Sequence, residues 1–506
     1  MSDLQASRGA SLLLALGLTL GMATLDASPA VAQETSGAQL AAAMQEVIAK
    51  AIATSERSVV AIAAVRRDTR EHDDQALNPF NQLQLFVAPQ PGDADFIPNE
   101  YATGVVVDAG GLILTANHVV RDDCDYWITT PERKTYRVTK IVGADPRSDL
   151  AVLSIEASDL VPIKLGDGSH LKKGQIVVAL GNPYSIARDG QLSATWGIVS
   201  NLERKDRPWL LQQWASEHEP PLAKPTLHHY GTLIETDARL PRGTSGGALL
   251  NLQGEMIGLT MTLSSGMGYE QPHGFALPVD ETFLRALDTL KQGREVEYGF
   301  LGIKPASLSR EVRLRGKHGV LVQDLVEGTP AERAGLVRND LITHIDDQPI
   351  FERDDLMLHI GKLAADASVR LTVERDGSPR VVTVQELSKY PLTGRKIVSN
   401  PVLPWRGLRV DYVTASRDFQ LWVVQRRLDL QGSVVITEVE ENSPAWQEGL
   451  RPNMMISHVG SKRVTTPKAF QEAVAGQVGP VKLRLTLPAN DQPVRTILPL
   501  ATSSAG

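Results

Sequence analysis

The sequence predicts a mainly β protein in which a large antiparallel β-barrel domain is followed by two copies of a smaller α+β domain. Short apolar strands separated by glycine- and proline-containing turns follow one another from about residue 58 to residue 278, and few helical patterns interrupt them. After Gly293 the chain repeats itself, because Gly328–Leu336 matches Asn442–Leu450 without gaps. A repeat of this kind indicates two related domains at the C-terminal end.

Length and composition limit the class of protein. At 506 residues the chain is too long for one hydrophobic core, so about two to four domains are expected. It is 42% hydrophobic and 22% charged, which is typical of a soluble globular protein. A formal net charge of -7 gives no electrostatic basis for nucleic-acid binding. The single cysteine, Cys124, excludes an intrachain disulfide and is predicted to be a small buried hydrophobe rather than a redox group.

Residues 1 to 32 read as a secretory signal peptide. Arg8 supplies a positive start, Ser11 to Leu25 an apolar core, and Ala30-Val31-Ala32 a small-x-small cleavage site. The alternative is a membrane anchor, but the apolar core is short for a full span. Cleavage after Ala32 predicts export to a periplasm-like space, with no membrane span in the mature chain.

Two long segments separate the elements that follow. Ala38 to Ile52 shows the spacing of an amphipathic helix, and Ser58 to Val65 is a strand. Arg66 to Glu100 is then either a functional loop or a disordered one. Arg204 to Tyr230 is predicted to be a surface loop close to the active face. Its pair His228-His229 lacks the usual spacing of metal ligands, so no metal site is predicted.

A histidine and an aspartate lie at the ends of two predicted strands. The stretch Gly104–Val120 is predicted to form two strands around the turn Ala109-Gly110-Gly111, and His118 comes just after the second of them. Asp149 directly precedes another apolar strand, Leu150–Leu153. A lone histidine or aspartate at a strand end is usually structural. The order His, Asp, Ser along the chain, each at a junction of strand and loop, instead favours nucleophilic catalysis.

Ser245 lies in the glycine-rich stretch Gly243-Thr244-Ser245-Gly246-Gly247, before the apolar run Leu249–Leu252. A tight loop suits an exposed nucleophilic hydroxyl, and the N–H groups of Gly243 and Ser245 are suited to stabilise an oxyanion beside it. The alternative is a hairpin turn with an incidental serine. Further along, Asp280 is predicted to cap a helix that ends at Gly293.

The motifs around the three residues resemble those of trypsin-like serine proteases, with the HtrA/Deg group of envelope proteases as the best match. The resemblance rests on five stretches: Leu114–Val120, Asp149–Leu153, Gly181–Pro183, Thr195–Ser200 and Gly243–Gly247. It implies a chymotrypsin-like pair of six-stranded barrels with the triad in the cleft between them. It also implies that His118 is the general base, Asp149 its orienting acid and Ser245 the nucleophile. Thr244, Ala248 and Trp196 depart from the family pattern without removing a catalytic group.

The repeated pattern S/T-P-A-x-x-x-G-L resembles PDZ domains, which hold peptide C-termini on a loop of backbone amides. The resemblance implies that Leu301, Gly302 and Ile303 bind the carboxylate in the first domain, and Gly407 and Leu408 in the second. Arg406 stands in the second loop where an apolar residue is usual. The predicted division is a signal peptide at 1–32, a protease domain at 33–293, PDZ domains at 298–388 and 405–500, and a linker at 389–404.

Together these features predict an exported serine endopeptidase that degrades unfolded or damaged envelope proteins and needs no cofactor or metal. The resemblance implies a homo-oligomer based on trimers, with the N-terminal helix and the apolar cluster Phe80–Phe86 as candidate contacts. Gly274–Pro278 resembles the strand that closes the specificity pocket, and the lack of a predicted buried acid there favours aliphatic substrates. The alternatives are an envelope chaperone that rarely cleaves and a non-catalytic peptide-binding scaffold.

Overall fold

The computed structural model describes residues 37–67, 96–182, 190–205, 226–262, 273–392, 394–487 and 494–499. The predicted signal peptide, the Phe80–Phe86 cluster and most of the segment 204–230 lie outside these residues. The predicted N-terminal helix is present as α1 (Gly37–Ser55) and leads through a short 3-10 turn, η1 (Glu56–Ser58), into the first strand. No helix in the described ranges is long and apolar enough to cross a bilayer.

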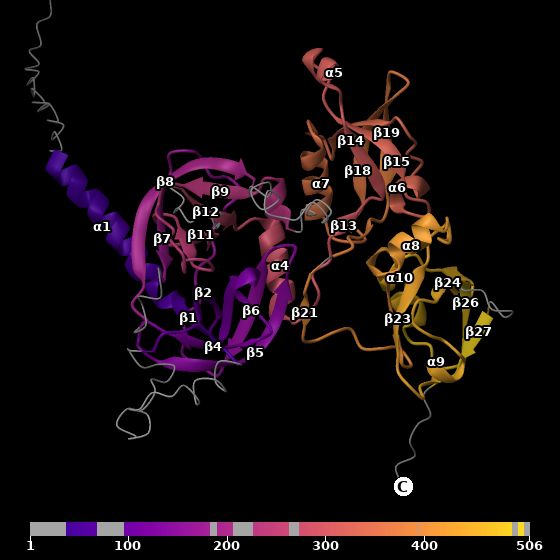
Figure 1. Ribbon diagram of the computed structural model, residues 1–506, viewed down its shortest axis with the longest axis horizontal. Coiled ribbons are helices and arrows are strands. Elements are labelled where there is room, and N and C mark those ends of the chain that lie inside the picture. The colour runs from indigo at the N-terminus through magenta and orange to yellow at the C-terminus, as the bar shows by residue number, and fades with distance from the viewer. Residues whose placement is uncertain are drawn as a thin grey trace, which may run out of the picture. The chain divides into compact units, whose positions relative to one another are not determined.

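The first six strands close into an antiparallel barrel, because the fifth strand pairs with both the fourth and the sixth (Figure 1). The strands are β1 (Val59–Arg66), β2 (Glu100–Asp108), β3 (Leu112–Ala116), β4 (Cys124–Thr129), β5 (Thr135–Asp145) and β6 (Leu150–Ile155). Strand β4 buries alternate residues, as a strand with one face in a barrel must. Cys124 is among them, which confirms that it is buried, and burial raises the pKa of its thiol to about 11.

The next six strands form a second closed barrel in the order β10-β11-β12-β9-β8-β7. Its strands are β7 (Ile176–Gly181), β8 (Ser193–Arg204), β9 (Leu233–Thr236), β10 (Ala248–Leu250), β11 (Met256–Met261) and β12 (Gly274–Pro278). Every residue of β11 is buried, which explains why Thr260 is its only polar residue. The predicted double barrel is therefore confirmed.

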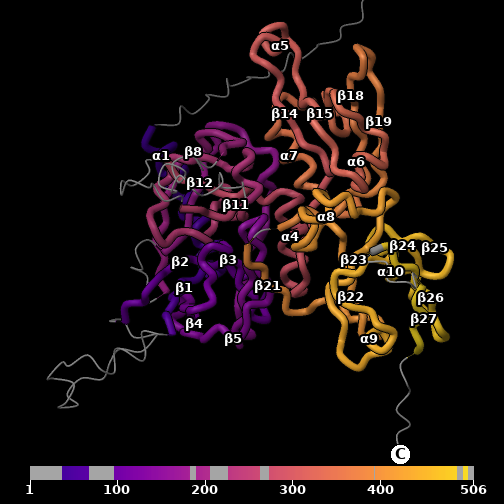
Figure 2. The backbone as a smooth tube through the Cα atoms, turned by 45° about the vertical axis from the view of Figure 1, so that its right-hand side comes forward, coloured from indigo at the N-terminus to yellow at the C-terminus, as the bar shows by residue number. Residues whose placement is uncertain are grey.

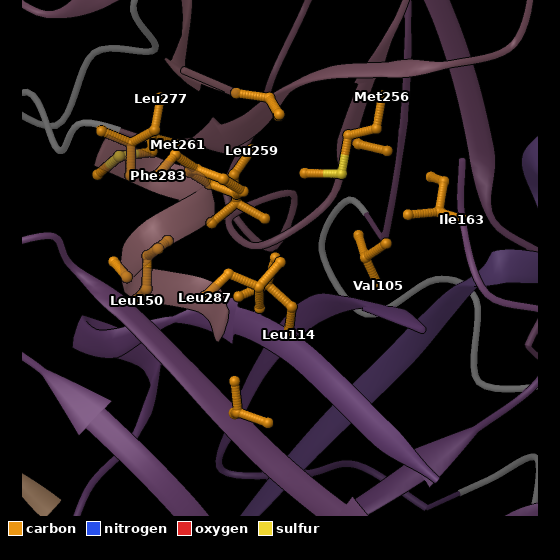
Figure 3. Packing of buried hydrophobic residues seen from close by; sticks show 14 of the residues in the cluster. Val105, Leu114, Leu150, Ile163, Met256, Leu259, Met261, Leu277, Phe283 and Leu287 are labelled. Atoms are coloured by element: carbon orange, nitrogen blue, oxygen red, sulfur yellow. The ribbon is translucent and has the colours of Figure 1, made fainter. Parts of the chain in front are cut away.

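One apolar cluster joins the two barrels (Figure 3). Val105, Leu114 and Leu150 enter it from the first barrel, and Met256 and Leu259 from the second. Helix α4 (Glu281–Lys291) covers the cluster with its own apolar side chains, which are Phe283, Ala286, Leu287 and Leu290. As predicted, Asp280 caps this helix by accepting a hydrogen bond from the N–H of Phe283 at 2.8 Å, and Gly293 follows its end at φ +70°.

The repeated segment folds twice into a sheet of the same order (Figure 2). The strands of the first copy are β14 (Ile303–Ser307), β15 (Val320–Leu325), β16 (Leu341–Ile345), β17 (Gln348–Pro349), β18 (Val369–Arg375) and β19 (Ser378–Val384). Those of the second are β22 (Leu408–Tyr412), β23 (Val434–Val439), β24 (Met455–Val459), β25 (Lys462–Arg463), β26 (Val481–Leu487) and β27 (Val494–Ile497). Each copy has its own apolar core, so the repeat predicted from sequence corresponds to two domains.

Among the described residues, three α-helices accompany each sheet. They are α5 (Arg310–Leu314), α6 (Pro330–Arg333) and α7 (Arg353–Lys362) in the first copy, and α8 (Phe419–Val424), α9 (Pro444–Gln447) and α10 (Pro467–Val474) in the second. The gapless match places a proline at the first position of both α6 and α9. Proline is favoured there because the first turn of a helix leaves its N–H groups unused.

Segments beside the repeats are built into the fold. Strand β13 (Gly299–Phe300) pairs with β20 (Ser388–Lys389), and β21 (Ile397–Val398) pairs with β5 of the first barrel. Lys389 is buried, and its Nζ lies 2.9 Å from carboxylate oxygens of Glu295 and Asp411 and 3.2 Å from one of Glu297. Burial alone lowers the pKa of Lys389, but these three carboxylates raise it overall, so the lysine stays charged.

Candidate active site

His118 and Asp149 are held together at the end of the first barrel. Strand β3 ends at Ala116, and the 3-10 turn η3 (Asn117–Val119) carries His118. The Nδ1 of His118 lies 2.8 Å from Oδ2 of Asp149, and the His118 N–H donates to Oδ1 at 2.9 Å. The N–H of Asn117 donates to the carbonyl of Asp149 at 2.8 Å. Both the carboxylate and the backbone of Asp149 are therefore tied to the turn that carries the histidine.

The turn that presents Asp149 is strained and strongly hydrogen-bonded. Asp149 has φ +59°, a conformation that non-glycine residues rarely adopt. The carboxylate of buried Asp145 accepts bonds from the N–H and hydroxyl of Ser148, at 2.8 and 2.6 Å, and from the hydroxyl of Tyr298 at 2.5 Å. Burial raises the pKa of Asp145 although these donors oppose the shift. Strain of this kind persists where surrounding contacts fix the backbone.

The charges of the pair support each other. Burial alone would lower the pKa of His118, but the charge of Asp149 and its hydrogen bond raise it overall. Burial alone would raise the pKa of Asp149, but His118, with a smaller contribution from His228, lowers it overall. Asp149 is therefore the anion at neutral pH, and it stabilises the protonated form of His118.

Ser245 is held beside this pair by strands of the first barrel. The N–H of Thr103 on β2 donates to the carbonyl of Ser245 at 3.0 Å, and the Thr103 hydroxyl donates to the carbonyl of Gly243 at 2.8 Å. Thr115 on β3, three residues before His118, donates its hydroxyl to the carbonyl of Thr103 at 2.8 Å. A loop of the second barrel is thus anchored next to the strand that leads to the histidine.

The hydroxyl of Ser245 is positioned by a residue that the sequence did not single out. Its Oγ accepts a hydrogen bond from the N–H of Thr262 at 2.9 Å. Within the described ranges, Oγ makes no hydrogen bond to His118. Ser245 as a whole is only 6% exposed, so most of the residue is buried in its loop. The contact with Thr262 uses an acceptor position of Oγ and leaves its proton available to a base.

The loop before Ser245 requires glycine and leaves backbone donors unused. Gly243 has φ +100°, and a Cβ there would lie 2.4 Å from the carbonyl oxygen of Asn182 and 2.6 Å from the ring of Tyr101. Over the described part of the chain, the N–H groups of Gly243 and Ser245 donate no hydrogen bond. These two amides are therefore free to bind a substrate oxygen, as an oxyanion hole requires.

The end of the second insertion is buried rather than exposed. It forms the 3-10 turn η5 (Leu227–Tyr230), and all four of its residues are buried, so the prediction of a surface loop is wrong for this part. The N–H of Leu227 donates to the carbonyl of Arg147 at 2.9 Å, which places η5 against the Asp149 turn. His229 lies with Nδ1 2.6 Å from the Thr226 hydroxyl, and no cluster of three metal-ligating residues occurs in the described ranges.

The predicted carboxylate loop of the first repeat precedes an edge strand. Leu301 is buried, Gly302 has φ +90°, and Ile303 begins β14, which lies at one end of its sheet. A Cβ on Gly302 would lie 2.0 Å from the Thr329 hydroxyl oxygen, so only glycine fits. In the described chain, the N–H groups of Leu301 and Gly302 donate no hydrogen bond.

The matching loop of the second repeat is closed on itself. The N–H of Trp405 donates to the carbonyl of Leu408 at 2.9 Å, and the N–H of Leu408 donates to the carbonyl of Trp405 at 2.8 Å. Gly407 keeps a left-handed conformation, at φ +80°. The guanidinium of Arg406 is buried and donates at 2.7 Å to three carbonyl oxygens, which belong to Gln477, Gly479 and Ile497. Arg406 therefore links the backbone segments that carry these three carbonyl groups inside the domain.

Comparison with known proteins covers most of this architecture. Residues 102–259 match the trypsin-like peptidase domain, and residues 299–385 and 435–487 match PDZ domains. A DegP-like periplasmic serine endoprotease of Pseudomonas fluorescens is 31% identical over 401 residues, which are 76% of each chain. One of Pseudomonas fulva is 30% identical over 389 residues, again 76% of each chain. The solved structure "HtrA-type protease AlgW with tripeptide" shares the fold, with 23% identity and a TM-score of 0.50 over 68% of this chain and 98% of that one.

Proposed function

We propose that this chain, which belongs to the family of DegP-like periplasmic serine endoproteases, cleaves peptide bonds with Ser245 as nucleophile, His118 as general base and Asp149 as orienting acid. The observation that supports this proposal most strongly is that the carboxylate of Asp149 contacts both the ring and the backbone N–H of His118. Such a contact fixes the histidine tautomer with Nε2 unprotonated and ready to take a proton. We expect unfolded or damaged envelope proteins to be the substrates.

The proposed reaction is acyl transfer in two steps. Ser245 Oγ attacks the substrate carbonyl carbon while its proton passes to Nε2 of His118, and the N–H groups of Gly243 and Ser245 bind the oxyanion. His118 then donates the proton to the leaving amine, and water hydrolyses the acyl-enzyme in the same way. The bond from Oγ to His118 would form on substrate binding, because catalytic hydrogen bonds are often long before the substrate is present. The aliphatic preference stays a prediction.

Labelling by a phosphonofluoridate reagent tests the nucleophile directly. The reagent reacts with a serine hydroxyl whose proton is taken by a neighbouring base, so we expect one label per chain, at Ser245. Mass spectrometry of the digested protein would locate it. Ser193 is an exposed serine of the same barrel and should stay unmodified. A label spread over exposed serines, with Ser245 unmodified, would contradict the assignment.

We further propose that the first PDZ domain, rather than the second, captures apolar peptide C-termini. In the first domain the amides of Leu301 and Gly302 are unused, and the edge strand β14 can accept a peptide as an extra strand. In the second domain the matching amides of Arg406 and Gly407 are also unused in the described chain, and β22 is likewise an edge strand, but the loop is closed by paired hydrogen bonds between the backbones of Trp405 and Leu408. The guanidinium of Arg406 is engaged by carbonyls of its own domain, so it is not placed to attract a carboxylate.

Titration of the full chain in its Ser245→Ala form, with fluorescent peptides ending in valine, tests this preference. Binding should be lost when the peptide is amidated, because the amide removes the charge that the loop recognises. Gly302→Ala should weaken binding by at least tenfold, since its Cβ would meet Thr329, while Gly407→Ala should change it less than twofold. Equal effects of the two substitutions, or indifference to amidation, would show the proposal to be wrong.

Assembly into homo-oligomers, with the trimer as the basic unit, is a separate proposal. Along α1 the side chains of Leu40, Met44 and Val47 are exposed and recur at helical spacing, which is typical of a face that packs against a partner. Light scattering at micromolar concentration should give three times the mass of one mature chain, or a multiple of that trimer mass. Met44→Asp should reduce that mass. A fully active monomer would contradict the proposal.

A further inference from the structure

Arg147 is the largest fully buried side chain in the described part of the protein. It is 0% exposed and lies two residues before Asp149 in the turn between β5 and β6. Its guanidinium carbon is 3.9 Å from the ring centroid of Tyr390 and 5.4 Å from that of Tyr230. Charged side chains are almost never fully buried without partners, and a cation stacked on aromatic rings is one such partnership. The position therefore needs an explanation beyond filling space.

The surroundings of Arg147 clamp the turn from several elements. Its backbone carbonyl accepts the N–H of Leu227, at the start of η5. Its guanidinium also extends to helix α7. Gly361, near the end of that helix, has no side chain, and a Cβ added there would lie 3.1 Å from Nη2 of Arg147. Tyr390 directly follows β20. Tyr298 directly precedes β13, and its hydroxyl donates a hydrogen bond to the carboxylate of Asp145, the last residue of β5 before the turn. Segments on both sides of the first repeat thus hold the turn that carries Asp149.

This turn depends on contacts with other elements of the fold. Asp149 is in a left-handed conformation, at φ +59°, which is uncommon for a non-glycine residue although aspartate adopts it more readily than most. Its contacts to His118 and Asn117 fix the carboxylate and the carbonyl, but they leave the preceding residues 146–148 to be fixed by other contacts. Asp145 holds Ser148 by two hydrogen bonds. Arg147 is the residue of this turn that reaches η5, α7 and Tyr390.

We propose that Arg147 is a positioning residue for catalysis, which holds the Asp149 carboxylate against His118 by stacking on Tyr390 and bracing the β5–β6 turn. The proposal rests on the triad proposed above. Arg147 acts through Asp149 and does not touch the reacting atoms. Tyr390, which follows the first repeat in the chain, therefore helps to hold Asp149 and His118 together.

The ionisation of His118 reports on this role. Besides burial, the pKa of His118 is set by Asp149, which raises it; the pKa of Asp149 is lowered by His118 and, less, by His228. The other titratable groups near the turn are Asp145, Tyr230, Tyr298 and Tyr390, together with the ion pair of Lys362 and Asp280, which lines a pocket with Ser148 and Leu150. If Asp149 swings away, the pKa of His118 falls. Loss of the positive charge of Arg147 alone would act in the opposite direction, so the sign separates the two causes.

The experiment compares full-length variants in peptide hydrolysis across pH. For Arg147→Met we expect kcat to fall at least tenfold with KM changed less than twofold, because the geometry of the pair is disturbed while the binding surface is kept. The acid limb of kcat/KM should move to lower pH. Tyr390→Leu should act in the same direction, and Tyr390→Phe, which keeps the aromatic face, should retain wild-type values.

The matched control is Arg137→Met. Arg137 also lies in the first barrel with its guanidinium over an aromatic ring, 5.9 Å from the centroid of Trp127, but its side chain is 64% exposed. It should leave kcat and the pH profile unchanged. If Arg147→Met does not fold, as judged by thermal melting, the Tyr390→Leu and Tyr390→Phe pair decides the question.

Three outcomes would overturn the proposal: a folded Arg147→Met with wild-type kcat, a lowered kcat with an unmoved acid limb, or a Tyr390→Phe as impaired as Tyr390→Leu. Failure of the triad itself would look different, because Ser245→Ala would then retain activity. An inactive Ser245→Ala beside a fully active Arg147→Met overturns the positioning role alone.

Discussion

Ser245→Ala is expected to lower casein hydrolysis by about 10⁵- to 10⁶-fold, the range seen when a triad nucleophile is removed. The oxyanion donors at Gly243 and Ser245 are backbone groups and survive the substitution, so a small residual rate above that of water should persist. Quantifying fluorescent casein fragments over long incubations would measure both rates. A variant within tenfold of the wild type would exclude Ser245 as the nucleophile.

The same substitution should leave the fold intact at a small cost. It removes the acceptor of the Thr262 N–H bond, and a lost hydrogen bond of this kind costs about 1 kcal/mol. We therefore expect a thermal midpoint lower by a few degrees and an unchanged circular dichroism spectrum. Ser193→Ala, at an exposed position of the second barrel, is the matched control and should retain full activity.

Local sequence patterns predicted the parts of the site that local structure determines. His118 follows one apolar strand and Asp149 precedes another. The ends of barrel strands lie at the rim of the barrel, so the neighbouring residues were enough to predict where these two side chains lie. The capped helix α4 and the repeated PDZ pattern were predictable for the same reason, since a cap or a turn involves residues a few positions apart. The predicted domain boundaries stay predictions.

The features that sequence patterns missed depend on residues far apart in the chain. The hydroxyl of Ser245 is bonded to Thr262, a contact that the glycine-rich loop by itself did not indicate. The guanidinium of Arg406 donates to carbonyl groups of residues more than 70 positions away, so its neighbours in the sequence did not indicate where the side chain points. Arg147 likewise stacks on Tyr390, and only the folded chain brings them together. Arginine is usually exposed, so its type alone argued for the surface.

Asp149→Asn is the second substitution with a large expected effect, a loss of about 10⁴-fold in kcat at neutral pH. The reason lies in the two contacts of the carboxylate. Oδ1 accepts the backbone N–H of His118, and Oδ2 faces Nδ1. An asparagine has one acceptor oxygen, which the backbone N–H would retain. Its NH₂ group would then face Nδ1, and His118 would be held with its proton on Nε2, where it cannot accept the proton of Ser245.

The pH profile of Asp149→Asn distinguishes this cause from general damage. Asp149 raises the pKa of His118, so removing its charge should lower that pKa and move the acid limb of the residual activity to lower pH. Asp167→Asn is the matched control, because Asp167 also faces a histidine, with Oδ2 2.7 Å from Nδ1 of His170, but on the exposed surface. That variant should keep wild-type kcat and pH dependence. An Asp149→Asn enzyme that shows the wild-type acid limb at reduced kcat would mean that Asp149 does not set the ionisation of His118, and the proposed pair would have to be abandoned.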